Sequence, residues 1–492
     1  KKIDSTGRIN LSASYAQNGS DNSNSAATQI FSANTLLDDY SVDQMNDSNT
    51  PQIKVAGNYN RRLKKKGRSL RLYINGDYST TDVNSRIITE GLSENLDLPG
   101  TLINGLQQQL QANEDRTANA GFNFTEPLSK KWRLGLLASY NHDEAEGNFS
   151  YEHENEIVRN VLTRTWSGTR LGTRLIHPFG KGNNFSMGVD YHHRELSLEG
   201  DETRQEPYRY WLPFARLRLR TGKSWINFRY NTSRQAPSLG QLQSIAIPGS
   251  TGRVAVGNPS LQPTYQHRLS GNFWMNDEFR GLSFYTSANA SYTDQAFGNA
   301  VTLTQGQQIY QTVNVSHAWS QSANLGSNIS LNFIKGQLQL NGNYNRTVGQ
   351  GLVNTISRTN INNNLTASAT LTTEFNEKSF LSLGYTWSRG KNFFQNDEAP
   401  AILTIRNQLS TRLELEFTRL IRLESRFTYS LFETSAFGGD NTVSDLMVAM
   451  EIRLFKTKEH FFRLFNRQLS LYFSRRANSK CQMPSPEIER SP

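Results

Sequence analysis

The sequence predicts an all-β protein: a transmembrane, antiparallel, up-and-down β-barrel with about 18 strands in this chain. Apolar and polar side chains alternate at every second position in segment after segment from Arg8 to Phe455. The polar face carries Arg, Asn, Gln and Glu, which a packed protein interior would leave unpaired at high cost. Short connections also alternate with long ones. A sheet between lipid and water needs apolar groups only at alternate positions, which fits 36% hydrophobic and 11% aromatic residues.

The first predicted strand shows the pattern most simply. Ile9, Leu11, Ala13 and Tyr15 fall on one face of an extended chain, and the residues between them are polar. Later strands repeat it at Leu70, Leu72, Ile74 and Tyr78; at Trp132, Leu134, Leu136, Ala138 and Tyr140; at Leu338, Leu340 and Tyr344; and at Leu413, Leu415 and Phe417.

The connections between these strands are of two kinds. The short ones, rich in Lys or Gly, lie at 64–67, 128–131, 180–183, 222–224, 334–336 and 376–379. The long ones, polar and irregular, are expected at Asn18–Thr50, Thr89–Glu114, Ala236–Pro263 and around Asp397–Pro400. Tight turns on one side and extended loops on the other are typical of outer-membrane barrels. An even strand count places both ends of the sheet on the short-turn side.

Aromatic residues next to the short turns predict an interfacial girdle. Trp132 follows Lys131, Trp225 follows Lys223 by two positions, and Phe380 follows Lys378 in the same way. Aromatic rings favour the level of the lipid headgroups in transmembrane barrels.

Other architectures are disfavoured. No run approaches the roughly 20 apolar residues of a membrane-spanning helix. A β-helix would show a fixed short repeat, and sandwiches would show shorter strands with turns every 8–12 residues or so. The single cysteine, Cys481, excludes a disulfide framework.

The formal charge of +10 comes from 53 Lys and Arg against 43 Asp and Glu, spread over turns and the polar strand face. A nucleic-acid binder would gather its charges in one patch, so outer-membrane lipid and lipopolysaccharide phosphates are the expected neighbours, and nucleic acid is not. The chain starts at Lys1 without Met or a signal peptide, so we expect a fragment or mature segment.

Two groups of charged side chains are predicted to line the lumen. Arg216, Arg218 and Arg220 form a ladder on one strand. On two strands joined by the turn near Arg419–Ile421, Arg412, Glu414 and Glu416 face Arg422, Glu424 and Arg426 as cross-strand pairs. One interpretation is a selectivity lining for an anionic or zwitterionic solute. The other is a salt-bridged ladder that stiffens the wall and contacts an internal plug.

No metal site, cofactor site or enzyme is predicted. The histidines at 142, 153, 192, 193 and 267 lack metal-ligand spacing, and the adjacent His192 and His193 point to opposite faces of a strand. Neither a Gly-rich phosphate loop, a nucleophile elbow nor an HExxH motif occurs.

One stretch is more specific than the periodicity. Arg229–Leu242 (RYNTSRQAPSLGQL) ends a strand, and Gly257–Pro263 (GNPSLQP) leads into the next; proline lacks the donor that a central strand position needs. These segments resemble the barrel of TonB-dependent receptors, most closely the large outer-membrane β-barrel family that accompanies a TonB-type plug domain. The layout resembles that family over roughly Ile9 to Phe455, but the specific motifs cover only about Arg229 to Phe273.

The resemblance implies a transporter of about 22 strands with a plugged lumen, so that these strands would be part of a larger barrel. It implies energy from a TonB-type partner acting through a plug domain absent from this chain. It also implies a small-molecule, peptide or saccharide ligand met by the loops, with Arg234, Gln241, Arg253 and Asn258 as candidate ligand-binding residues.

The chain departs from the family pattern in two ways. No plug-like segment precedes Lys1, no energy-coupling box is visible, and about four strands are missing, so a longer reading frame is expected. We divide the chain into a barrel at 1–455 and a C-terminal extension at 456–492. That extension, in which Leu469, Leu471 and Phe473 alternate, is interpreted as an extra strand, a periplasmic extension or a shifted frame.

The leading functional hypothesis is therefore the barrel of an outer-membrane transporter that takes up a scarce solute. The alternative is a passive porin or a structural barrel in a surface assembly. An enzyme barrel comes third, since it needs a nucleophile with a positioned base.

Overall fold

The computed structural model describes residues 6–32, 35–93, 105–153, 156–200, 203–248, 253–304, 307–395, 400–418, 421–435, 439–453 and 461–476. One sheet contains all of its strands. No helix in these ranges is long and apolar enough to cross a membrane.

The strands of the wall are long, and each is paired antiparallel with the wall strand that follows it in the sheet. In chain order the elements are β1 (Gly7–Ser32), β2 (Thr35–Arg62), β3 (Ser69–Ser93), β4 (Gly105–Pro127), β5 (Arg133–His153), β6 (Glu156–Phe179), β7 (Asn183–Glu199), β8 (Arg204–Thr221), β9 (Ser224–Gln235), α1 (Leu239–Leu242), β10 (Ala246–Pro248), β11 (Arg253–Val256), β12 (Thr264–Asp277), η1 (Glu278–Arg280), β13 (Leu282–Thr304), β14 (Gln307–Leu331), η2 (Asn332–Ile334), β15 (Gly336–Val353), β16 (Ile356–Asn376), β17 (Ser379–Gln395), β18 (Ile402–Thr418), β19 (Ile421–Thr434), β20 (Gly439–Arg453) and β21 (Phe461–Arg476).

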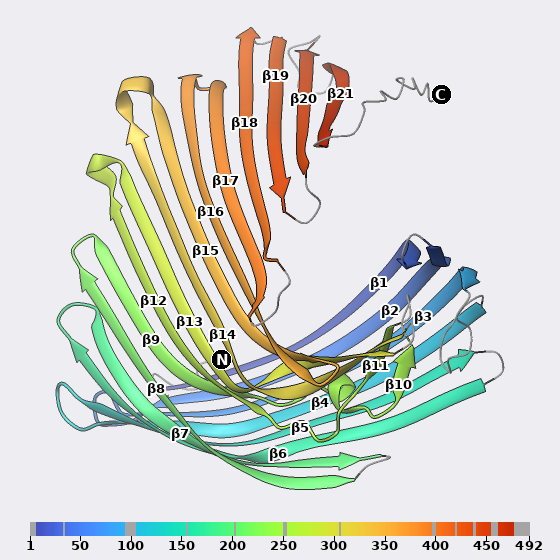
Figure 1. Ribbon diagram of the computed structural model, residues 1–492. Helices are drawn as coiled ribbons and strands as arrows, with labels where there is room; N and C mark the ends of the chain where they lie inside the picture. Colours follow the sequence, from blue (N-terminus) through green and yellow to red (C-terminus); the bar gives the residue numbers. More distant parts are fainter. Residues whose placement is uncertain are drawn as a thin grey trace.

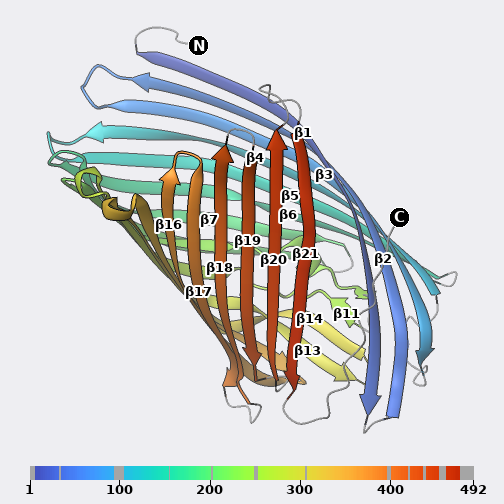
Figure 2. The same ribbon diagram turned by 90° about the horizontal axis from the view of Figure 1, so that it is seen from above.

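These strands form an up-and-down barrel wall. Each strand from β1 to β9 pairs with the next, β9 pairs with β12, and β12 to β21 continue in order. Up to Arg453, β1–β9 and β12–β20 supply eighteen wall strands, which agrees with the predicted number. In the tail, β21 pairs with β20 and adds one more strand. Figures 1 and 2 show a strongly curved sheet with β1 and β21 at its two edges, and no pairing joins those edges within the described ranges.

The two faces of the wall differ as the alternation predicts. Leu171 on β6, Leu269 on β12 and Leu409 on β18 are 54%, 55% and 44% exposed on one face. Exposing such apolar side chains to water on every strand would be unfavourable, whereas lipid contacts them without cost. The opposite face of the same strands carries Arg170, Arg268 and their polar neighbours, so the wall has an apolar outside and a polar inside.

The short turns lie where the sequence predicts them. Residues 63–68, 128–132, 180–182, 222–223, 332–335 and 377–378 connect successive strands at one rim. Where the chain turns most tightly it uses left-handed residues, such as Gly180 with φ 56° and Gly222 with φ 56°. Glycine adopts this conformation at no steric cost.

The prediction of an irregular loop over Asn18–Thr50 is wrong. Asn18 pairs with Thr50, and the register continues to Ser32 and Thr35, so this segment is a long hairpin. Most of Thr89–Glu114 is also strand, with residues 94–104 outside the described ranges. The physical reason is that a hairpin standing in water needs no apolar face, while pairing still satisfies its backbone groups. A polar sequence without alternation therefore does not distinguish a hairpin in water from an irregular loop.

Ala236–Pro263 is a long connection, as predicted, but it is folded and not irregular, and it lies inside the curve of the wall (Figure 1). We call it the inner loop. It contains α1, β10 and β11; β11 pairs with β14, and β10 pairs with β11. Its side chains Leu242 and Leu261 are 1% and 0% exposed. They form one buried cluster with inward-facing residues of β6 and β7: Leu162, Trp166, Leu196 and Leu198.

Candidate functional site

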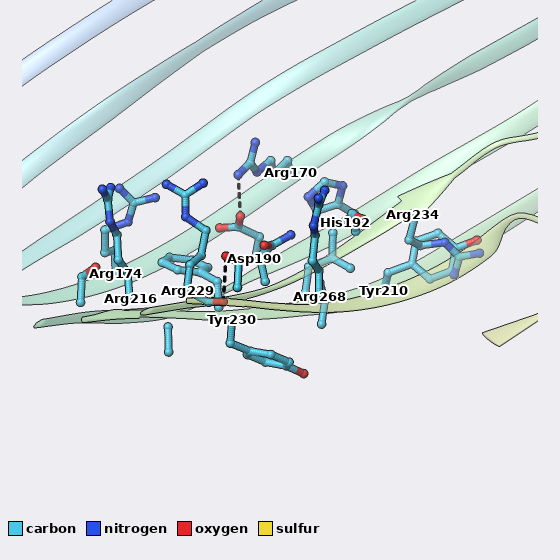
Figure 3. Close-up of a pocket in the computed structure, with 18 of the residues that line it drawn as sticks. Arg170, Arg174, Asp190, His192, Tyr210, Arg216, Arg229, Tyr230, Arg234 and Arg268 are labelled. Atoms are coloured by element: carbon cyan, nitrogen blue, oxygen red, sulfur yellow. Dashed lines mark hydrogen bonds and ion pairs between the residues drawn. The ribbon is translucent and has the colours of Figure 1, made fainter. Parts of the chain in front are cut away.

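A cavity of about 830 Å³ lies on the inner face of the wall, beside the inner loop. Seven arginines line it, contributed by five strands, and we call this set the arginine basin: Arg170, Arg174, Arg194, Arg216, Arg229, Arg234 and Arg268. Figure 3 shows Arg170, Arg174, Arg216, Arg229 and Arg268 projecting from the same side of the sheet. Side chains that lie far apart in sequence thus converge on one space.

The strand register brings the basin together. Arg216 on β8 lies directly opposite Arg229 on β9, and Arg170 on β6 lies opposite His192 on β7. Opposite residues of an antiparallel pair have their Cβ atoms only about 4.5–5.5 Å apart. The register of β8 and β9 therefore makes Arg216 and Arg229 neighbours.

A glycine makes room for the aromatic ring on which one basin arginine lies. The Arg174 guanidinium lies over the Phe214 ring, 4.8 Å from its centroid. The Phe214 ring in turn occupies the space above Gly188, where an added Cβ would lie 2.6 Å from Phe214 Cζ. Gly188 thus allows the aromatic platform on which Arg174 rests.

The basin is short of negative charge. Among the described residues of its lining, Asp190 is the one carboxylate, and it accepts a hydrogen bond from Arg170 at 2.5 Å. Arg216 Nε donates to the neutral Asn227 side chain at 3.0 Å, and Arg194 lies over the Trp166 ring. In the described part of the chain, no ion pair joins the other six basin arginines to an acid.

Several polar atoms of the lining are buried without a hydrogen-bond partner in the described ranges. They are Arg170 Nε, His192 Nε2, Tyr210 Oη and Arg234 Nε. A buried polar group left without a partner costs about 1–3 kcal/mol. Four such polar atoms therefore gather at one cavity.

The first predicted ladder extends from the basin toward the turn rim. Arg216 belongs to the basin, whereas Arg218 and Arg220 line a second cavity of about 520 Å³ with Lys223, Trp225 and other residues near the turn. Their strand carries Leu217 and Leu219 on the other face. A continuous arginine-rich surface therefore runs along the inner face of β8.

The second predicted group pairs within itself. Glu414 lies opposite Glu424, and Arg412 reaches both carboxylates, at 3.4 and 3.6 Å. Arg422 pairs with Glu414, Arg426 pairs with Glu424 at 2.7 Å, and Lys378 pairs with Glu416 at 2.8 Å. These charges already have partners, unlike those of the basin.

The four predicted ligand-binding residues have different surroundings, since Arg234 lies on β9 and the other three lie in the inner loop. Only Arg234 lines the basin, and it lies over the Tyr210 ring and donates to Pro263 O at 2.8 Å. Gln241 accepts from the Ser238 backbone at 2.9 Å, and Asn258 donates to Thr312 O at 3.1 Å. Arg253 lies over the Tyr310 ring at 5.7 Å. Gln241 and Asn258 thus hold the loop in shape, and their role in ligand binding stays a prediction.

The predicted girdle needs a correction at two positions. Trp132 stacks on His177, with ring centroids 4.3 Å apart, beside the outward residues of β5 and β6. In contrast, Trp225 lies opposite Arg220, and Phe380 lies opposite Glu414 with the Arg412 guanidinium 5.3 Å from its ring. Trp225 and Phe380 therefore lie on the inner face, because strand parity and not distance from the turn decides which face a side chain takes.

Sequence reasoning missed five of the basin arginines: Arg170, Arg174, Arg194, Arg229 and Arg268. The alternation of faces along a strand predicts that Arg170 and Arg268 point inward, because each stands next to an outward leucine, Leu171 or Leu269. Nothing in the sequence gave the register that places them around one cavity.

Comparison with known proteins gives a family match. The family model described as "Outer membrane protein beta-barrel family" matches residues 61–404. A search of curated proteins gives no match.

Several solved structures are similar at low identity. The FrpB iron transporter from Neisseria meningitidis (F5-1 variant) has 10% identity and a TM-score of 0.39, covering 88% of this chain and 79% of that one. BauA, the ferric preacinetobactin receptor from Acinetobacter baumannii, has 11% identity and a TM-score of 0.46, covering 93% and 72%. The siderophore receptor PirA from Pseudomonas aeruginosa has 11% identity and a TM-score of 0.36, covering 87% and 78%.

Proposed function

The chain belongs to the outer membrane protein β-barrel family, and from this premise we propose that it is the barrel of a transporter that takes up a scarce solute across the bacterial outer membrane. The observation that carries the proposal is the arginine basin. A cavity of about 830 Å³ has the size of a small-molecule site, which is about 300–1,000 Å³. It lies on the inner face of the wall, where a solute would pass.

The inner loop supports binding before passage. It is anchored inside the wall by the buried side chains Leu242 and Leu261, and its first residue, Ala236, borders the basin. A transporter needs a site where a dilute solute is held.

We further propose that a plug fills the lumen and that a TonB-type protein supplies energy through it. The paired charges on β18 and β19 offer such a plug a rigid polar wall, since their arginines and carboxylates hold one another in place. Lipid and lipopolysaccharide are the proposed neighbours of the outer face, with its exposed leucines.

Liposome swelling tests the transporter against the porin. The complete protein is reconstituted in liposomes, and the entry of arabinose, a small neutral sugar, is followed by light scattering. A plugged transporter is expected to swell liposomes within about twofold of empty ones, whereas a general porin with an aqueous channel would swell them many-fold faster. Rapid arabinose entry through the complete protein would exclude the transporter.

A further inference from the structure

We propose that the arginine basin binds a small ligand that carries two or more oxyanion groups, either phosphates or clustered carboxylates. This inference rests on the proposed transport function and names the substrate class of that same site. It depends on the charge, the geometry and the size of the basin.

The charge of the basin is unbalanced. Its seven arginines face one carboxylate, Asp190, which Arg170 already holds at 2.5 Å. Like charges directly opposite each other on a sheet are destabilising, yet Arg216 and Arg229 occupy such a pair. A bound polyanion offsets this repulsion.

The geometry suits oxyanions in particular. Each guanidinium presents a planar fork of donors that matches the two oxygens of a carboxylate or phosphate. The arginines come from β6, β7, β8, β9 and β12 and project from the same side of the sheet, so several of them can contact one ligand in the cavity. Buried donors without a partner, Arg170 Nε and Arg234 Nε, add to this capacity.

The position and size of the basin identify the ligand as a diffusible small molecule. The arginines lie on the inner face, away from the outward leucines, so lipid phosphates do not reach them. The other charged cluster, on β18 and β19, supplies its own carboxylates and therefore has no such vacancy for an anion. The basin differs because, in the described part of the chain, six of its seven arginines have no acidic ion-pair partner.

Calorimetric titration tests the inference. The full chain, folded in detergent at low salt, is titrated with inorganic pyrophosphate, with citrate and with sucrose as a neutral probe. Pyrophosphate or citrate is expected to bind, and sucrose is not. The double variant Arg229→Gln/Arg268→Gln is expected to weaken anion binding at least tenfold, since both side chains extend into the cavity without an acidic partner.

Arg426→Gln is the matched control. It removes a positive charge from the same inner face, but from the ion-paired cluster on β19. It is expected to change anion affinity less than twofold. Equal weakening by the control and by the double variant would reduce the effect to overall charge and overturn the inference.

A third arm identifies the source of the oxyanion. The preference between pyrophosphate and citrate separates phosphate from carboxylate ligands. Binding of an acidic peptide, such as a poly-glutamate decamer, with no binding of either small anion would assign the basin to a protein segment and overturn the proposal. Anion binding is measured without transport, so rapid arabinose entry together with anion binding would refute only the transporter, and plugged liposomes without anion binding would refute only this inference.

Discussion

At the scale of single residues, two groups of arginines differ in whether carboxylates lie beside them. On β18 and β19, Glu414 and Glu424 are 7% and 9% exposed and lie directly opposite each other. Arg412 contacts both carboxylates and so separates two buried like charges. In the basin no carboxylate plays the same part between Arg216 and Arg229.

Arg412→Gln is expected to destabilise the barrel by about 1 kcal/mol, because it removes an ion-pair partner from two buried carboxylates that each keep one other arginine. Urea unfolding in detergent, followed by tryptophan fluorescence, measures the change. Adding Glu424→Gln to this variant is expected to recover part of the loss, since the like-charge pair is then gone. A double variant as unstable as the sum of the two single ones would contradict the proposed role of Arg412.

At the scale of elements, the inner loop is the feature that most shapes the lumen. Leu242 on α1 packs against residues of β6 and β7, and Gly147 on β5 leaves space for the loop, since an added Cβ there would lie 2.4 Å from Leu239 Cδ2. Buried Pro237 and Pro263 stand at its two ends. A proline at a strand entrance removes a donor where none is needed.

Leu242→Ala is expected to weaken the docking of the inner loop by about 2–5 kcal/mol, the cost of a buried leucine-sized cavity. Trypsin would then cut faster after the exposed Arg253, which is read by mass spectrometry of timed digests. Leu128→Ala is the control, because Leu128 is 56% exposed in a turn at the other rim. Unchanged cleavage after Arg253 in the Leu242 variant would show that this leucine does not hold the loop.

At the scale of the whole molecule, the two faces of the wall set its environment. Leu409, 44% exposed near the middle of β18, faces outward, while its neighbour Gln408 has the parity of the inner Arg412 and Glu414. Adjacent positions of one strand therefore face different surroundings, lipid on the outside and water on the inside.

Leu409→Arg is expected to destabilise the protein in liposomes by about 2–4 kcal/mol, the cost of arginine on the lipid face near the midplane. Gln408→Arg is expected to cost less than about 1 kcal/mol, since it adds the same side chain to the wet face. Guanidinium titrations of both variants in the same lipid make the comparison. Similar losses for the two would mean that the outer face of β18 does not contact lipid.

The sequence by itself determined the class of fold, the short turns and the membership of each strand face. These are local properties, because a period of two is a property of a single extended strand. Trp225 and Phe380 were within reach of the same rule, since Trp225 shares its parity with Asn227, and Phe380 with Ser382 opposite Arg412. Distance from a turn was the wrong criterion for them.

Only the tertiary structure decided the arginine basin, the inward fold of the loop and the pairing of the polar hairpin at Asn18–Thr50. Each depends on register between strands or on contacts between distant segments. Register is fixed by backbone pairing across the sheet, and a slip of one residue would turn every side chain to the other face. The sequence therefore specifies the two surfaces of the wall, while the pairing of its strands specifies which charges meet.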